Sequence, residues 1–169
     1  MQSEAIEAAG SNGRRLRLEF VWRNDRYQQI VSAIDAQGRV QVLLESIEGS
    51  ATDDWPPSPP LQTLTVEQLP DGRRVALLLG MAGRSHWSAS AEPLAGEAKV
   101  AVDLACRHAS QAVWLGSRYR RVGDVGARLP VSEGEDTSLS DSGRVIDVQP
   151  LTIAAPATTR WRYVLSIEY

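Results

Sequence analysis

The chain has 169 residues, of which 43% are hydrophobic and 23% are charged, and its formal net charge is −3. This composition is typical of a single soluble globular domain, and the negative balance excludes a bulk electrostatic attraction to nucleic acid. No apolar run approaches the length of about eighteen residues that crosses a bilayer, so we expect no membrane span. The N-terminal segment lacks a basic region followed by an apolar run, and we therefore expect no signal peptide and a cytoplasmic location.

The N-terminal part of the chain predicts a tail and then a meander of strands. Residues 1–13 are small and polar, which is typical of a flexible tail ahead of a single β domain over residues 14–169. Three segments then alternate between apolar and polar residues, with turn sequences between them, at 15–22, 27–34 and 40–47. Strands joined by such tight turns favour an antiparallel meander.

Residues 49–60 break this regularity, because four of the last five positions are proline. Such a density of proline excludes a helix and a paired strand, and it favours a stiff polyproline II segment. We expect a rigid crossover between sheets, with Trp55 lying on the body of the domain. Recognition of the segment by a module that binds proline-rich peptides is the alternative.

The middle of the chain predicts two further strands and then a hairpin. Residues 61–68 alternate, and the apolar run at 74–80 predicts a central strand that is buried on both faces. Residues 85–107 show the clearest alternation, in two arms separated by Pro93 and Gly96. Neither of these two residues suits the interior of a ladder, so the segment is interpreted as a β-hairpin.

The last third of the chain predicts three more strands, at residues 112–121, 144–151 and 159–169. Residues 122–143 are irregular and acidic at their centre, which predicts a mobile surface loop. About ten short strands without a helix indicate an all-β fold, a single-domain antiparallel β-sandwich or flattened barrel.

The single cysteine and the two histidines form a candidate metal site. Cys106 and His108 are two residues apart, and the predicted hairpin brings His86 near Cys106 across the ladder. One thiolate and two imidazoles would supply three of the four ligands of a tetrahedral zinc ion. The rest of that strand face is apolar, so a buried and unreactive Cys106 is the preferred interpretation. A Cys–His nucleophile oriented by Asp103 is weaker still, because Asp103 projects to the other face.

Three pairs of arginines are spaced two residues apart within predicted strands, and they form a candidate anion-binding patch. The pairs are Arg15 and Arg17, Arg118 and Arg120, and Arg160 and Arg162. Each pair projects from one sheet face, and guanidinium groups of two neighbouring pairs within about 8 Å would attract a phosphate, a sugar acid or an acidic protein segment. The alternative is a solvated face on which acidic residues such as Glu19, Asp103 and Glu168 pair with the arginines.

No motif indicates catalysis or a cofactor. A Walker loop, a dinucleotide-binding glycine pattern and a serine nucleophile elbow are all missing from the sequence, and the acidic stretches at 53–54 and 133–136 lack the spacing of a calcium loop. The sequence therefore predicts a non-catalytic binding or protein-interaction module, with an acidic protein segment or a small anion as ligand.

Two other functions stay open. The first is a small-ligand carrier, or an enzyme, with a pocket inside a β-barrel. Its polar lining would come from Tyr27, Gln29, Trp114 and Tyr163. The second is a structural component of a larger assembly, which would present a flat apolar patch.

Overall fold

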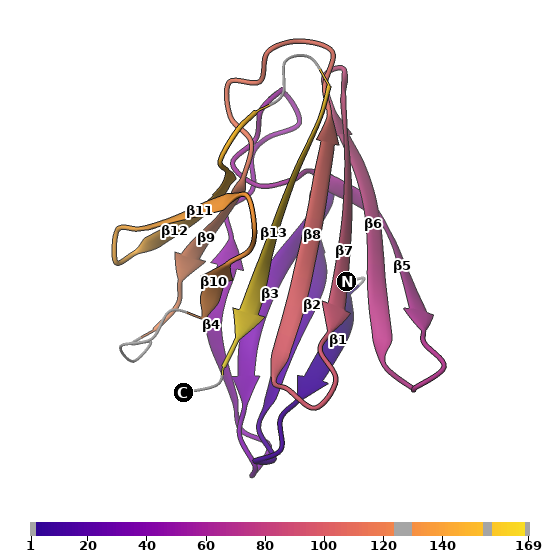
Figure 1. Cartoon of the computed structure of the whole chain (residues 1–169), viewed down its shortest axis with the longest axis vertical. Coiled ribbons are helices and arrows are strands. Elements are labelled where there is room, and N and C mark those ends of the chain that lie inside the picture. Colours follow the sequence, from indigo (N-terminus) through magenta and orange to yellow (C-terminus); the bar gives the residue numbers. More distant parts are fainter. Residues whose placement is uncertain (1–2, 124–129, 154–156, 168–169) are drawn as a thin grey trace.

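The computed structural model describes residues 3–123, 130–153 and 157–167, and these residues form thirteen strands and no helix. All the strand pairs are antiparallel, and they build two sheets that pack against each other (Figure 1). The seven-stranded sheet contains, in spatial order, β1 (Ser3–Ala9), β2 (Arg15–Arg23), β3 (Arg26–Ile34), β4 (Val40–Ser46), β9 (Ser117–Arg121), β12 (Val145–Pro150) and β11 (Thr137–Asp141). The six-stranded sheet contains β10 (Val131–Glu133), β13 (Thr158–Ser166), β8 (Lys99–Arg107), β7 (Ser85–Pro93), β6 (Arg74–Ala82) and β5 (Leu61–Gln68). The all-β prediction is confirmed.

The prediction of a flexible tail at residues 1–13 is wrong for the residues that the structure describes. Strand β1 pairs with β2 along its whole length, from Ser3 opposite Val21 to Ala9 opposite Arg15. Ile6 and Ala8 are almost fully buried in the core. Because alternate residues of the segment are apolar, pairing with β2 removes them from water, and this gain orders a segment whose composition is otherwise that of a tail.

The mobile loop predicted at residues 122–143 is also partly wrong. Residues 124–129 lie outside the described part of the chain, but β10 and β11 are strands within the remainder. The turn between them is held by Thr137, whose Oγ1 accepts a hydrogen bond from the Gly134 amide and donates one to the Gly134 carbonyl. The Gly134 amide also lies 3.1 Å from the carbonyl oxygen of Arg162 on β13. Local side-chain bonds of this kind are invisible to a search for periodicity.

Strand β6 is buried on one face only, whereas its sequence predicts burial on both. Ala76 and Leu78 face the core, but Leu77, Leu79 and Met81 are 41%, 59% and 49% exposed. A strand that is apolar on both faces resembles a central strand of a covered sheet, and the pattern alone cannot tell whether a second layer covers it. The outer face of the six-stranded sheet is open to solvent at this strand.

A buried hydrogen-bond network joins the two sheets through the core. Tyr119 on β9 donates to Gln29 Oε1 on β3 at 2.7 Å, which leaves its oxygen to accept the Tyr163 hydroxyl of β13 at 2.6 Å. Trp161, also on β13, donates to Ser117 Oγ on β9 at 3.2 Å. Burial raises the pKa of Tyr163 to about 12 and holds the pKa of Tyr119 well above its usual value, so both phenols stay protonated.

The proline-rich segment connects β4 in one sheet to β5 in the other. It is fastened to the body of the domain at successive residues. Trp114 donates its indole N–H to the Pro57 carbonyl at 3.1 Å, and Ser58 donates to the Arg118 carbonyl at 2.9 Å while accepting the Arg118 amide at 3.1 Å. Trp55 is partly buried against the core. These contacts fix where β5 begins.

A second buried polar cluster lies where this segment leaves β4. Ser46 accepts the Gln29 amide at 2.8 Å and donates its hydroxyl to the Glu48 carboxyl. The other carboxyl oxygen, Glu48 Oε2, is shielded from solvent and has no hydrogen-bond partner among the described residues. Burial raises the pKa of Glu48 to about 7, although the bond from Ser46 and the charge of Arg26 oppose this shift. Glu48 is therefore mostly neutral below about pH 7 in the folded protein.

We expect Glu48→Gln to change how stability depends on pH. The pKa is higher in the folded protein than in the unfolded chain, so Glu48 favours folding below pH 4.5 and this contribution is lost as the pH rises toward 7. Relative to the parent, the variant should gain on the order of 1–3 kcal/mol in the free energy of unfolding between pH 4.5 and 8. Urea denaturation across this range measures the difference, and two parallel pH profiles would contradict the assignment.

We also expect large losses of stability from truncations in β13. Trp161 is 1% exposed and Leu165 is fully buried, so each replacement by Ala removes apolar contacts and leaves a cavity. The expected costs are about 3–5 kcal/mol for Trp161→Ala and about 2–5 kcal/mol for Leu165→Ala. Thermal melts test this, with Val113→Ala as the control because Val113 is 84% exposed. Variants that melt with the parent would remove β13 from the core.

Candidate binding face

The outer face of the six-stranded sheet carries an ordered grid of side chains. Residues opposite each other in antiparallel strands point to the same face, so the register of β5, β6, β7, β8 and β13 defines rows across the sheet. One row consists of Thr63, Leu79, Ser88, Ala105 and Arg160. The next row consists of Thr65, Leu77, Ser90, Asp103 and Arg162. A hollow of about 620 Å³ lies over these strands.

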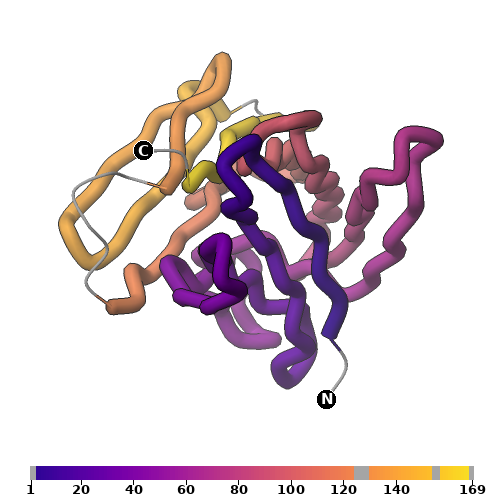
Figure 2. Tube along the Cα trace, turned by 90° about the horizontal axis from the view of Figure 1, so that it is seen from below, coloured from indigo at the N-terminus to yellow at the C-terminus, as the bar shows by residue number. Residues whose placement is uncertain are grey.

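The hollow arises from the small side chains of the two middle strands. Ser88 and Ser90 on β7 and Ala105 on β8 form a low floor. Leu77 and Leu79 of β6 form one wall, and Arg160 of β13 forms the other. Figure 2 shows the β5–β6 hairpin standing out to one side of the two layers. We call this hollow, which spans the strands from β5 to β13, the outer groove.

The β6 wall of the outer groove is an exposed apolar row. Leu77, Leu79 and Met81 are two residues apart, so all three project from one face of the strand. The other large exposed apolar residues that the structure describes are isolated: Val40, Val113 and Leu151. Single exposed apolar residues are ordinary, but an aligned set in a hollow is typical of a binding surface.

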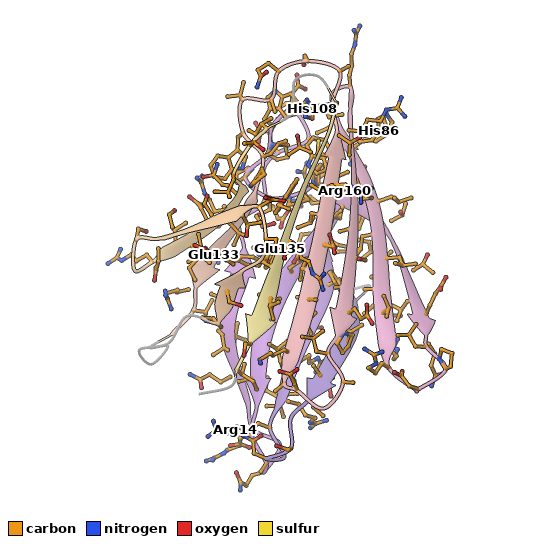
Figure 3. The ribbon with its side chains drawn as sticks, viewed as in Figure 1. Arg14, His86, His108, Glu133, Glu135 and Arg160 are labelled. Atoms are coloured by element: carbon orange, nitrogen blue, oxygen red, sulfur yellow. The ribbon has the colours of Figure 1, made fainter. Side chains whose placement is uncertain are left out.

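Basic side chains gather at one end of this face. His86 on β7 is directly opposite Arg107 on β8, and Arg160 on β13 is the diagonal neighbour of Arg107. Figure 3 shows His86 and Arg160 toward the same end of the molecule. We call these three residues the basic end. All three are exposed, and none makes a hydrogen bond or ion pair with any part of the chain that the structure describes. Glu67 and Glu92 lie toward the opposite end of the groove, where Glu92 accepts a bond from Arg73.

The structure does not bring the three predicted arginine pairs together. The pair on β13 lies on the six-stranded sheet, whereas the pairs on β2 and β9 lie on the other sheet. Strands β3 and β4 separate β2 from β9, which amounts to about 14 Å at the usual strand spacing. Four of the six arginines instead pair with carboxylates: Arg15 with Glu7, Arg118 with Asp147, Arg120 with Glu45, and Arg162 with Asp103. Anion binding by these pairs stays a prediction.

The candidate metal ligands point in different directions. His86 pairs with Arg107, and its neighbour Trp87 pairs with Cys106. The side chain of His86 therefore points to the outer face, away from the buried Cys106. His108 is buried, and its Nε2 lies 3.0 Å from the Thr159 hydroxyl. Within the described residues, no three His, Cys, Asp or Glu side chains are grouped so that they could hold a metal ion.

The residues expected to line an interior pocket are engaged in packing. Gln29 and Tyr163 belong to the network between the sheets, and Tyr27 stacks edge-on against Trp22 with ring centroids 5.0 Å apart. Trp114 binds the proline-rich segment. Trp161, Tyr119 and Tyr163 are among the large side chains that are fully buried between the sheets, and the hollow that we describe lies on the outer face of the six-stranded sheet.

Sequence analysis missed the β6 row and the roles of His86 and Arg107. One signal was present in the sequence. In the segment 74–82, both the inward and the outward positions are mostly apolar, whereas the outward positions of the next strand are Ser88, Ser90 and Glu92. A second covering layer would have required apolar residues on both strands. The contrast between neighbouring strands therefore indicates an uncovered apolar row.

Comparison of the chain with protein-family models, with curated proteins and with solved structures found no match. In the part of the chain that the structure describes, no helix has the length and apolar character needed to cross a membrane.

We expect Cys106 to resist thiol reagents in the native protein. Its side chain is fully buried, and desolvation raises its pKa to about 12, so the reactive thiolate is scarce at neutral pH. Labelling with an aromatic disulfide should be slow in buffer and complete in denaturant. Rapid labelling of the folded protein would contradict the buried position.

Proposed function

We propose that this protein is a non-catalytic binding module, and that its ligand lies in the outer groove. The observation that carries the proposal is the exposed apolar row of Leu77, Leu79 and Met81, of which Leu77 and Leu79 line a hollow of about 620 Å³. Exposure of three aligned apolar side chains costs solubility, and a ligand that covers them relieves this cost.

The chemistry of the groove supports binding rather than a reaction. Its floor offers hydroxyl groups from Ser88 and Ser90, which donate and accept hydrogen bonds, and Asp103 is the charged residue directly opposite Ser90. Asp103 lies 3.7 Å from Arg162, in a loose and exposed ion pair. These groups orient a ligand, and the apolar wall supplies the favourable burial.

The architecture fits this role as a sandwich with a recognition face. The two sheets have separate edge strands, β1 and β11 in one and β5 and β10 in the other, which supports a sandwich over a closed barrel. The inward faces build the core, and the outward face of the six-stranded sheet is left for a partner.

A random peptide library displayed on phage tests the proposal. We expect selected peptides to perturb the backbone amide signals of β6, β7 and β8 in nuclear magnetic resonance spectra. The double variant Leu77→Thr and Leu79→Thr should weaken their binding at least tenfold and leave the melting temperature nearly unchanged, because both side chains are exposed.

The matched control is Val40→Thr with Val113→Thr, which removes two exposed apolar residues elsewhere. This variant should bind the selected peptides like the parent. Perturbations that gather away from the outer groove, or equal binding by the Leu77 and Leu79 variant, would overturn the proposed site.

A further inference from the structure

The two walls of the outer groove have different chemistry and the same repeat. Leu77 and Leu79 of β6 line one side of the hollow and Arg160 of β13 lines the other, and Arg162 follows Arg160 on the same face of β13. Residues two apart on a strand are separated by about 6.6 Å, so both walls present groups at this spacing. An extended polypeptide has the same spacing between alternate side chains, which project to one side, while the side chains between them project to the other side.

A segment that lies over β7 and β8, parallel to these strands and with its pleat parallel to the sheet, directs every second side chain toward β6 and the others toward β13. We propose that the ligand is an extended segment of a partner protein in which apolar and acidic residues alternate. This inference rests on the proposed function, because it assigns the chemistry of the ligand in that same groove.

The charges on the face support the acidic half of this pattern. Arg107 and Arg160 are diagonal neighbours, about 7–8 Å apart at that geometry, and no described carboxylate pairs with either of them. His86, opposite Arg107, adds a further hydrogen-bond donor. Two neighbouring guanidinium groups without counter-charges repel each other, and a ligand carboxylate placed between them removes this repulsion and accepts bidentate bonds.

The remaining charges set the direction of the ligand. Arg162 is already paired with Asp103, and the carboxylates of Glu67 and Glu92 lie toward the other end of the face. Ligand acids are therefore attracted to the basic end and repelled from the Glu67 end. The acidic residues that contribute most to binding are those beside Arg107 and Arg160.

A protein segment fits the face better than an acidic polysaccharide does. Sugar rings pack best on flat aromatic side chains, and the outward residues of the two central rows include no Trp, Tyr or Phe. The apolar wall consists of flexible aliphatic side chains, which are complementary to Leu, Ile or Val of a peptide.

Labelled peptides of matched length test the assignment by fluorescence anisotropy. The probes are repeats of Leu-Glu, of Leu-Lys and of Ser-Glu, and polygalacturonate is the polysaccharide competitor. We expect the Leu-Glu peptide to bind most tightly. The double variant Arg107→Gln and Arg160→Gln should weaken it about five- to tenfold at low salt, with a smaller effect at high salt.

The control variant is Arg15→Gln with Arg120→Gln, which removes the same two charges from the other sheet and should bind like the parent. If the Leu-Lys peptide binds as well as Leu-Glu, and only Leu77→Thr with Leu79→Thr abolishes binding, the acidic assignment fails and the proposed function stands. If polygalacturonate binds more tightly than the Leu-Glu peptide and displaces it, the assignment of a protein partner fails. If none of the three peptides binds, the assignment of an alternating acidic segment fails, and the peptide selection described above decides the proposed function.

Discussion

The hydrogen bond between the hydroxyls of Tyr119 and Tyr163 is the constraint on which the arrangement of the two sheets depends. It joins β9 of one sheet to β13 of the other in the middle of the core, where an unpaired hydroxyl would cost more than the bond gains. Because Gln29 accepts the Tyr119 proton, the direction of every bond in the network is determined. The aromatic rings fill the space between the sheets, and the polar tips fix which strands lie opposite each other.

This constraint positions the binding face. Strand β13 carries Tyr163 toward the core and Arg160 and Arg162 toward solvent, so the register that satisfies the network also places the arginine wall. At the other side of the sheet, the proline-rich segment holds the start of β5 and thereby the β5–β6 hairpin that supplies the apolar wall. The outer groove is open because β7 and β8, which lie between these two anchors, carry small outward residues.

Alternation along the chain was enough to predict the fold class and most of the strands, because period-two burial is a local property. It was not enough where pairing decides the structure. Strand β1 is ordered through its pairing with β2. The face that His86 occupies depends on the register of the β7–β8 hairpin, and an odd change of register turns a side chain to the other face. The sequence around Leu77 and Leu79 resembled that of a buried strand, because the sequence of one strand does not show whether a second layer covers its outer face.

In β7, the residues that stabilise the core and the residues that face the groove alternate along one strand. Trp87, Ala89 and Ala91 face the core, while the positions between them face the groove. A substitution at Ser88 or Ser90 changes the depth of the groove and the hydrogen bonds that it offers, and it leaves the packed interior untouched. Substitutions at the outward positions can therefore change which ligand this face binds, one residue at a time, without changing the packing of the core.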